Sequence, residues 1–277
     1  MSLVLRQIAA VIRLEWKKTF LSRRGFWVYL LALAPAGLTL LHAAFSSRSH
    51  AMGRRGHTLF QDTEVFAVMF QTYFLRLGIF FGSVGIFSNL FRGEMLEKTL
   101  HYYLLVPIRR EWLVLGKYVS GLLVAVVLFT LSVAASMYLI GRHQGAAWEE
   151  FVLHGAGRAQ LAQYLLITIL ACLGYGAVFL LSGLVVRNPM IPAAVVMVWE
   201  NLNPFLPRFL KEISIIFYLQ GLSPVNVPGI PPPLSVLVVD SDPIPGSIAV
   251  PGLLVVACAL LAYAATRART LEISYGE

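Results

Sequence analysis

Long apolar runs, separated by short polar segments, are the feature that most constrains how this chain can fold. Hydrophobic residues make up 58% of its 277 positions and charged residues 13%, with a mean hydropathy of +0.74. A soluble domain does not need so apolar a composition to fill one core. A helix that crosses a bilayer core about 30 Å thick needs about 20 mostly apolar residues. We therefore expect an all-α integral membrane protein with six transmembrane helices, at 26–45, 65–91, 112–140, 161–186, 190–206 and 248–266.

The positions of the positive charges predict how the six helices are oriented. The segments 1–25, 92–117, 187–189 and 267–277 hold 14 Lys and Arg residues, against seven in the loops between them. Cytoplasmic loops carry the excess of Lys and Arg in membrane proteins. We therefore expect both termini in the cytoplasm, with 26–266 as the membrane domain and 267–277 as a cytoplasmic tail. The net charge of +8 is assigned to topology and lipid headgroups, so we expect no nucleic-acid partner.

The segment 1–25, ahead of the first span, is predicted to form an amphipathic helix. Ile8, Ile12 and Trp16 recur at helical spacing, and Arg13 flanks this apolar stripe. Such a helix lies in the membrane interface with its basic side towards anionic headgroups. The alternative is a cytoplasmic extension of the first span.

The segment 205–247, before the last span, departs from the pattern of a membrane helix. Pro204 and Pro207 stop a helix, and the tract 231–233 is three consecutive prolines that favour an extended conformation. We expect residues 205–222 to be partly re-entrant or to lie on the outer surface. The residues that follow are too rich in Ile, Leu and Val for an unstructured linker, so an ordered extracytoplasmic loop is expected.

The polar stretch between the second and third spans, residues 93–107, is predicted to be a cytoplasmic helix. Its apolar residues, which recur at helical spacing until Pro107, are Met95, Leu96, Leu100, Tyr103 and Leu104. Glu94 and Glu97 lie near its N-terminus, where the helix dipole favours acids. A short helix anchored at both ends by membrane spans can act as a rigid lever. The alternative is a solvated connector that covers helix ends.

The same stretch carries an ordered set of small, acidic and basic residues. In chain order these are Gly93-Glu94, Thr99-Leu100, Leu104-Leu105, Pro107, Arg109 or Arg110, and Gly116-Lys117. This order resembles the cytoplasmic signature of ABC-type-2 transporter permeases, which runs from Gly-Glu through Gly-Thr-Leu-Glu, leucines and a proline to an arginine and a distal Gly-Lys. Lys98 and His101 depart from that pattern. The six-span layout, the N-terminal helix and the long loop before the last span are also similar to that family.

The resemblance implies the membrane subunit of an ATP-driven exporter in a prokaryotic plasma membrane. It further implies a second permease copy, as a homodimer or pseudodimer, and two ABC ATP-binding subunits beneath it. The helix around 94–106 would insert into a groove on the ATP-binding subunit. The residues expected to serve this coupling are Gly93, Glu94, Leu96, Glu97, Thr99, Leu100, Tyr103, Leu104, Pro107 and Arg109.

Nucleotide chemistry is expected on the partner and not on this chain. No G-x-x-x-x-G-K-[ST] motif occurs, and Gly116-Lys117 is followed by Tyr118 without a preceding glycine-rich loop. ATP and magnesium would therefore be bound by the ATP-binding subunit. We expect no catalytic residue, no metal ligand and no cofactor here, because no convergent catalytic set is evident at membrane depth.

Two ionisable residues fall inside predicted spans, Arg76 in the second and Glu200 in the fifth. Each costs about 2.5–3.5 kcal/mol or more on insertion scales, so such residues rarely face lipid. One interpretation places them, as a pair, on the translocation path or in a gate. The other is a structural ion pair between helices or an interfacial position.

Small residues and histidines add two further expectations. Gly78, Gly82 and Gly85 let the second span pack closely, either within the chain or across a dimer. Five histidines fall at or beyond the predicted outer surface, and we interpret them as exposed loop residues and not as a copper site. They are His42, His50, His57, His143 and His154.

Two alternative functions stay open at this point. In the first, the chain keeps its ATP-binding partner but transmits force through the loop 221–247 to an extracytoplasmic partner, without passing a substrate. In the second, it is a membrane enzyme or anchor without an ATPase. The sequence leaves the substrate open among drug, lipid, glycan, peptide and ion.

Overall fold

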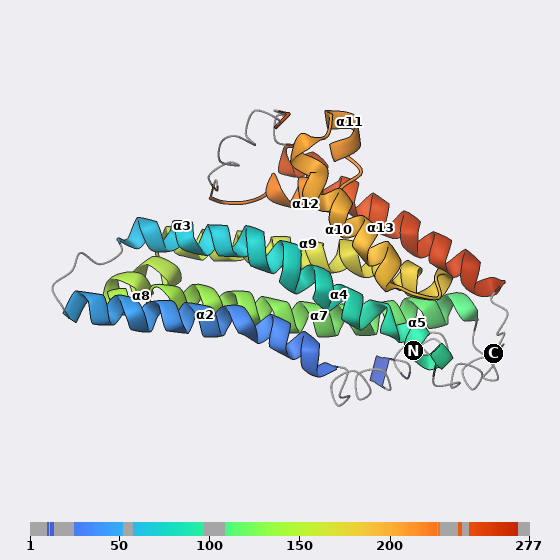
Figure 1. Cartoon of the computed structure of the whole chain (residues 1–277), viewed down its shortest axis with the longest axis horizontal. Helices are drawn as coiled ribbons and strands as arrows, with labels where there is room; N and C mark the ends of the chain where they lie inside the picture. The colour runs from blue at the N-terminus through green and yellow to red at the C-terminus, as the bar shows by residue number, and fades with distance from the viewer. Residues whose placement is uncertain are drawn as a thin grey trace.

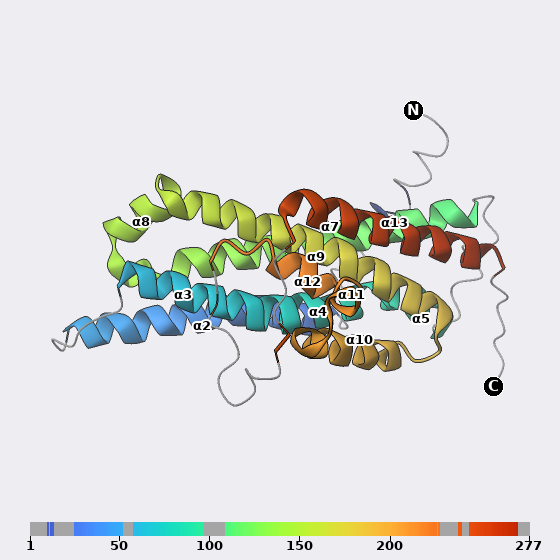
Figure 2. The same ribbon diagram turned by 90° about the horizontal axis from the view of Figure 1, so that it is seen from above.

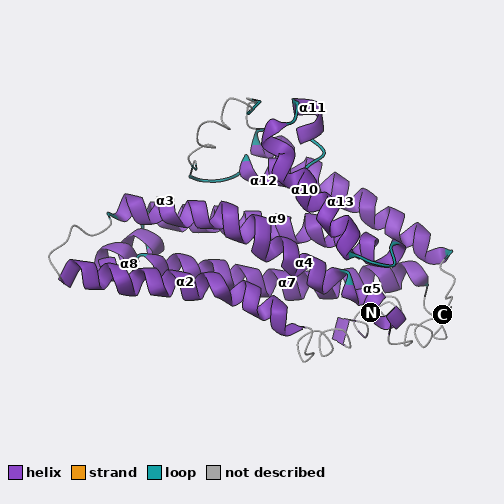
Figure 3. Ribbon diagram, in the orientation of Figure 1, coloured by secondary structure: helices purple, strands orange, loops and turns teal. Residues whose placement is uncertain are grey.

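The computed structural model is a bundle of long helices that run along one axis, and no strand occurs in its described residues (Figures 1 and 3). These residues are 10, 12–13, 25–51, 58–96, 109–225, 227, 238–239 and 244–270. The predicted all-α class is confirmed for them. The predicted interfacial helix 1–25 lies outside the described residues except for residues 10, 12, 13 and 25. Of the predicted tail 267–277, residues 267–270 are described and 271–277 are not.

Four long helical stretches form the body of the bundle. They are α2 (Gly25–Ala51), the continuous series α3 (Leu59–Met69), η1 (Phe70–Gly78) and α4 (Ile79–Phe87), then α7 (Arg110–Ile140) and α9 (Ala156–Val185). Shorter helices connect or flank them: α5 (Asn89–Leu96), η2 (Arg142–Gln144), α8 (Ala146–Leu153), α10 (Met190–Leu202), η3 (Asn203–Phe205), α11 (Arg208–Lys211) and α12 (Ile215–Gln220). The series ends with the long helix α13 (Gly246–Arg269).

Five helices in the described residues are long and apolar enough to cross a membrane, so the expected six spans are not confirmed. The missing one is the predicted fifth span, 190–206. Its helix α10 has only 13 residues, which is about 20 Å at 1.5 Å per residue, short of a 30 Å bilayer core. Pro204 and Pro207 interrupt regular helix at its end, so mean hydropathy overstated its length.

The chain reverses at mid-length of the bundle after α10. Figures 1 and 2 show that α10 leads away from the end where α9 finishes, that α11 and α12 lie beside the middle, and that α13 returns to that same end. Helix α12 packs against α9 and α13. Residues 205–222 therefore form short helices and a turn, as their prolines suggested. Their re-entrant or surface position in a membrane stays a prediction.

Aromatic rings join the second long stretch to α9 and form the centre of the core. Phe66 and Phe70 lie 5.0 and 4.6 Å from the ring of Tyr164, measured between ring centroids. Phe80 lies 5.1 Å from Phe179 in the same way. These side chains are at most 2% exposed, and such aromatic pairs add to the stabilisation from buried area.

Gly82 explains how closely α4 approaches α7. A Cβ atom on this residue would lie 2.3 Å from the ring of Phe129 on α7. The ring therefore occupies the space that a side chain would need. Of the two interpretations of the glycine face, packing within the chain is the one that Gly82 satisfies.

We predict that Gly82→Ala lowers the free energy of unfolding by about 1–3 kcal/mol, the usual cost of overpacking a core. Gly37→Ala on α2 is the matched control, since a Cβ atom there meets nothing within 4 Å. Thermal unfolding of both purified variants in detergent measures the effect. Equal stability of Gly82→Ala and wild type would contradict this account of the packing.

Candidate functional site

A buried ion pair joins the two halves of the Gly-Glu and Gly-Lys pattern. The Nζ atom of Lys117 lies 2.8 Å from Oε1 of Glu94, and the two side chains are 0% and 2% exposed. Glu94 comes from α5 and Lys117 from the second turn of α7, so the pair connects residues on either side of the segment 97–108. The Lys117 ammonium also lies 5.5 Å from the ring centre of Phe91, a cation–π distance.

Helix α5 is held against α9 as well as α7. The Ser88 turn between α4 and α5 fits against Gly183 of α9, where a Cβ atom would lie 2.5 Å from the Ser88 carbonyl oxygen. The Ser88 hydroxyl donates to the Phe179 carbonyl at 3.4 Å. The α4–α5 joint is therefore fixed to the central helix, and α5 continues the second long stretch towards the segment 97–108.

Polar contacts at the same end join the start of α7 to the end of α13. The Arg110 guanidinium donates to the carbonyl oxygens of Ala268 at 3.4 Å and Arg269 at 3.0 Å. Arg269 in turn forms an ion pair with Glu111. The last carbonyls of a helix lack partners within it, so Arg110 bonds groups that α13 leaves open.

The predicted coupling residues divide into a buried and an exposed set. Gly93 and Glu94 are buried in α5, so Glu94 faces Lys117 and not solvent. Leu96 is 62% exposed, and Arg109 is exposed at the N-cap of α7. The remaining six lie outside the described residues: Glu97, Thr99, Leu100, Tyr103, Leu104 and Pro107.

We predict that Lys117→Met lowers the free energy of unfolding by about 3–5 kcal/mol, because it removes the cation facing a buried carboxylate. Adding Glu94→Gln should recover much of this loss, since no buried charge of the pair is left. Denaturant unfolding in detergent measures both variants. Arg208→Met, which breaks the exposed pair with Glu212, is the control and should cost about 1 kcal/mol at most. A Lys117→Met protein as stable as wild type would show that Lys117 does not compensate the buried carboxylate of Glu94.

Glu200 binds the N-terminus of α12. Its carboxylate accepts from the Ser214 hydroxyl at 2.6 Å and from the backbone amides of Ile215 and Ile216 at 3.0 Å each. Glu200 itself is 5% exposed. The first amides of a helix have no partner within it, so this carboxylate satisfies two of them. Glu200 thereby fixes the turn between α10 and α12.

Arg76 does not form a direct ion pair with Glu200, although both are among the described residues. Its guanidinium donates instead to the side-chain oxygen of Asn201 at 2.9 Å. Arg76 lies on η1, a π-helix, which is rare and occurs frequently at functional sites. The two residues predicted as a pair thus lie at the same end of α10 but have different partners. Glu200, on α10, bonds α12, whereas Arg76 bonds Asn201 of α10.

We predict that exchanging the two charges, Arg76→Glu with Glu200→Arg, is no better tolerated than Glu200→Arg alone. An arginine at position 200 cannot accept hydrogen bonds from the amides of Ile215 and Ile216. Hydrogen exchange of these two amides is the local measurement, and it should accelerate in both proteins. Glu200→Gln, which keeps one acceptor, should show a smaller acceleration. Full protection in the exchanged protein would indicate a direct pair.

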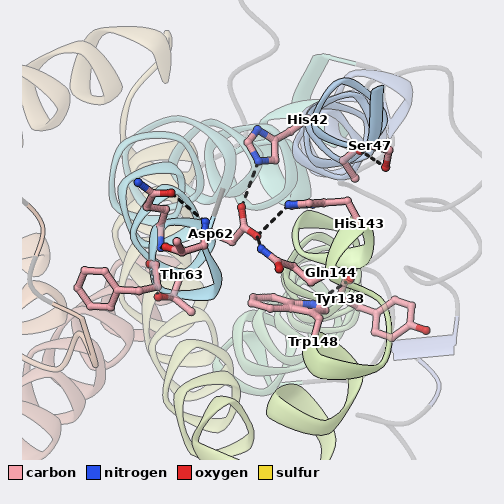
Figure 4. A network of polar contacts seen from close by, with 12 residues as sticks. His42, Ser47, Asp62, Thr63, Tyr138, His143, Gln144 and Trp148 are labelled. Atoms are coloured by element: carbon pink, nitrogen blue, oxygen red, sulfur yellow. Dashed lines mark hydrogen bonds and ion pairs between the residues drawn. The ribbon is translucent and has the colours of Figure 1, made fainter. Parts of the chain in front are cut away.

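A second polar cluster lies at the opposite end of the bundle, around Asp62 of α3 (Figure 4). The Nε2 atoms of His42 and His143 lie 3.4 and 3.3 Å from its carboxylate oxygens. The Gln144 amide donates to the same carboxylate at 2.9 Å. The cluster therefore joins α2, α3 and η2, which are far apart in sequence.

The expectation that these histidines are exposed loop residues is wrong for His143, whose side chain is fully buried, and for His42, whose side chain is 24% exposed. The reason is that α3 begins at Leu59, six residues before the predicted span. Asp62 therefore lies on the inner face of a helix and not in a loop. His50 and His57 have no described side chains, and His154 is exposed, as expected, at the C-cap of α8.

Three further side chains that make these contacts are not predicted from the sequence: Lys117, Asn201 and Ser214. The sequence does contain a signal for Lys117. The recognised pattern ends in this lysine, and an unpaired lysine in a membrane helix costs free energy, so a partner for it is expected. Nothing local marks Asn201 or Ser214, because their roles arise from the reversal of the chain after α10.

Comparison with known proteins points to one family. The family described as ABC-2 family transporter protein has a model that matches residues 11–203, well over half of the chain. The matched region contains the Glu94–Lys117 pair and ends at η3, before α11 and α12. Among the curated proteins, none matches this chain significantly.

Proposed function

Because this chain belongs to the ABC-2 transporter family and is thus a multi-pass membrane subunit of an ABC transporter, we propose that it couples ATP hydrolysis on a separate subunit to substrate export. Two ATP-binding subunits bind ATP and magnesium in this proposal. A second permease copy, identical or homologous, completes the membrane part in a prokaryotic plasma membrane. The chain itself contributes no catalytic residue and no cofactor.

The observation that carries the proposal is the buried Glu94–Lys117 pair. It connects the two ends of the segment 97–108, which contains most of the proposed coupling residues. A displacement of this segment by the ATP-binding subunit would therefore move α5 and the first turns of α7 together. Because α5 follows α4 through the Ser88 turn, which is fixed to α9, the displacement would reach the second long stretch as well.

In the proposed cycle, the helices joined by these contacts move together as a rigid body. Closure of the two ATP-binding subunits on ATP pushes on the segment 97–108, and α4 and α7 tilt in response. Arg76 on η1 draws the end of α10 with it through Asn201, and Glu200 holds α12 to that end. In this proposal, Arg76 and Glu200 belong to the part that moves on the pathway side.

We predict that Leu100→Asp abolishes co-purification of an ATP-binding subunit from native membranes, because a charge replaces an apolar residue of the proposed contact. Leu153→Asp is the matched control, since Leu153 is 53% exposed on α8 at the opposite end of the bundle (Figure 1). The co-purified subunit is identified by magnesium-dependent ATP hydrolysis. If wild type retains no such subunit, the proposal of ATP coupling is lost.

Force transmission without substrate passage is the second candidate, and one observation favours it. The loop residue Val239 donates its amide to the Pro204 carbonyl at 3.1 Å and accepts from Lys211 Nζ at 2.5 Å. Val239, within the loop 221–247, is therefore bonded to the segment 204–211, next to the end of α10 that carries Glu200. A movement of α10 would reach an outer partner through this loop. ATP-dependent transport into vesicles that contain only this chain and its ATP-binding subunits would exclude this alternative.

A further inference from the structure

A cavity lies between α2 and the α3–η1 stretch and shares His42 with the Asp62 cluster. Its volume is about 670 Å³. Much of its wall is apolar, with Leu38 from α2 and Val65 and Val68 from α3. These three side chains are 36–52% exposed, so the cavity opens to the surface of the bundle as a groove, within two candidate membrane spans.

Glu64 is the one carboxylate among the residues that line the groove, and no described Lys or Arg lines it. Within the described part of the chain, Glu64 forms no hydrogen bond and no ion pair. The other ionisable lining residue, His42, lies beside Asp62. An ionisable group within a membrane span is costly and normally has a functional partner. Among the described residues, the groove thus presents a carboxylate without an ion-pair partner beside apolar side chains.

The far end of the groove is shaped by a proline and a π-helix. Pro35 lies inside α2, and because proline has no amide hydrogen, the carbonyl four residues earlier, on Leu31, loses its helical donor. The hydroxyl of Tyr73, on η1, donates to that carbonyl at 3.0 Å. Tyr73 also lines the groove. The wall at this end is therefore held by a specific bond between the two helices.

We propose that this groove is a binding site for a lipophilic cation, with the cationic centre at Glu64 and the apolar groups along Val65, Val68 and Leu38. Charge complementarity supports this class of ligand, since the groove has a carboxylate and no described Lys or Arg. The apolar wall supports a ligand that reaches the site from the membrane. The ligand's being cargo rests on the proposed transport function, whereas its binding needs no ATP-binding subunit.

Equilibrium binding of radiolabelled tetraphenylphosphonium to the full chain in phosphatidylcholine nanodiscs tests the proposal, with empty nanodiscs as the baseline. Tetraphenylborate, an anion of nearly the same shape, is the matched probe. We expect saturable binding of the cation that is at least tenfold tighter than binding of the anion. Glu64→Gln should remove this preference, while Glu150→Gln, an exposed acid on α8, should keep it.

A second variant separates charge from shape. Val68→Trp fills the groove and should weaken binding of both probes by roughly tenfold or more. Glu64→Gln should weaken binding of the cation alone. Gel filtration of each variant checks that it is folded and monodisperse. Equal binding of the two probes to wild type, or an unchanged cation preference in Glu64→Gln, would overturn the proposal. So would a Val68→Trp protein that binds the cation normally but loses its dimer, since the groove would then be a protein interface.

These outcomes are distinct from failure of the proposed function. The binding experiment contains no ATP and no ATP-binding subunit, so it can succeed where co-purification fails. Conversely, loss of the cation site would leave coupling through the segment 97–108 untouched.

Discussion

The need to satisfy every backbone polar group away from water is the constraint on which this structure depends. In the hydrocarbon region an unsatisfied amide or carbonyl costs several kcal/mol, and helical hydrogen bonding is interrupted at Pro35 inside α2 and at the start of α12. Each interruption is matched by a side chain from another element. Tyr73 bonds the carbonyl that Pro35 leaves open, and Glu200 accepts from the first amides of α12. The places where helical hydrogen bonding is interrupted are therefore also the places where a side chain bonds one helix to another.

Charge inside the bundle follows the same logic. The Glu94–Lys117 pair is inaccessible to solvent, and a buried pair of this kind is weak support for stability in itself, because desolvation offsets much of the attraction. Its value lies in position, since both partners lie next to the segment 97–108. A hydrophobic pair could pack there equally well. Apolar packing is not directional, however, whereas the charged hydrogen bond holds α5 and α7 in one relative position.

Much of the fold follows from the sequence, and the failures have physical causes. Hydropathy predicts α2, α7, α9 and α13 to within a few residues at most ends, because long apolar runs leave few other options. It overestimates the span 190–206, because a mean over residues ignores the prolines that end α10. It misplaces Asp62, because an acidic residue lowers hydropathy although its carboxylate is bonded inside. Pairings such as Arg76 with Asn201 depend on the reversal of the chain, which no local pattern encodes.

Helix α9 is the structural centre of the bundle, and its place in the chain has a consequence for biosynthesis. It packs against α4, α5, α7, α8, α12 and α13. In its apolar 18-residue stretch 61% of the residues are buried, against 28% for α2 and 22% for α13. The rings of Phe66, Phe70 and Phe80 contact aromatic rings of this helix. During synthesis the second and third long stretches thus enter the membrane before α9, their shared partner, exists. Contacts among α2, α4 and α7 can form earlier, whereas those of α4 and α7 with α9 can close only once the ribosome has passed Val185.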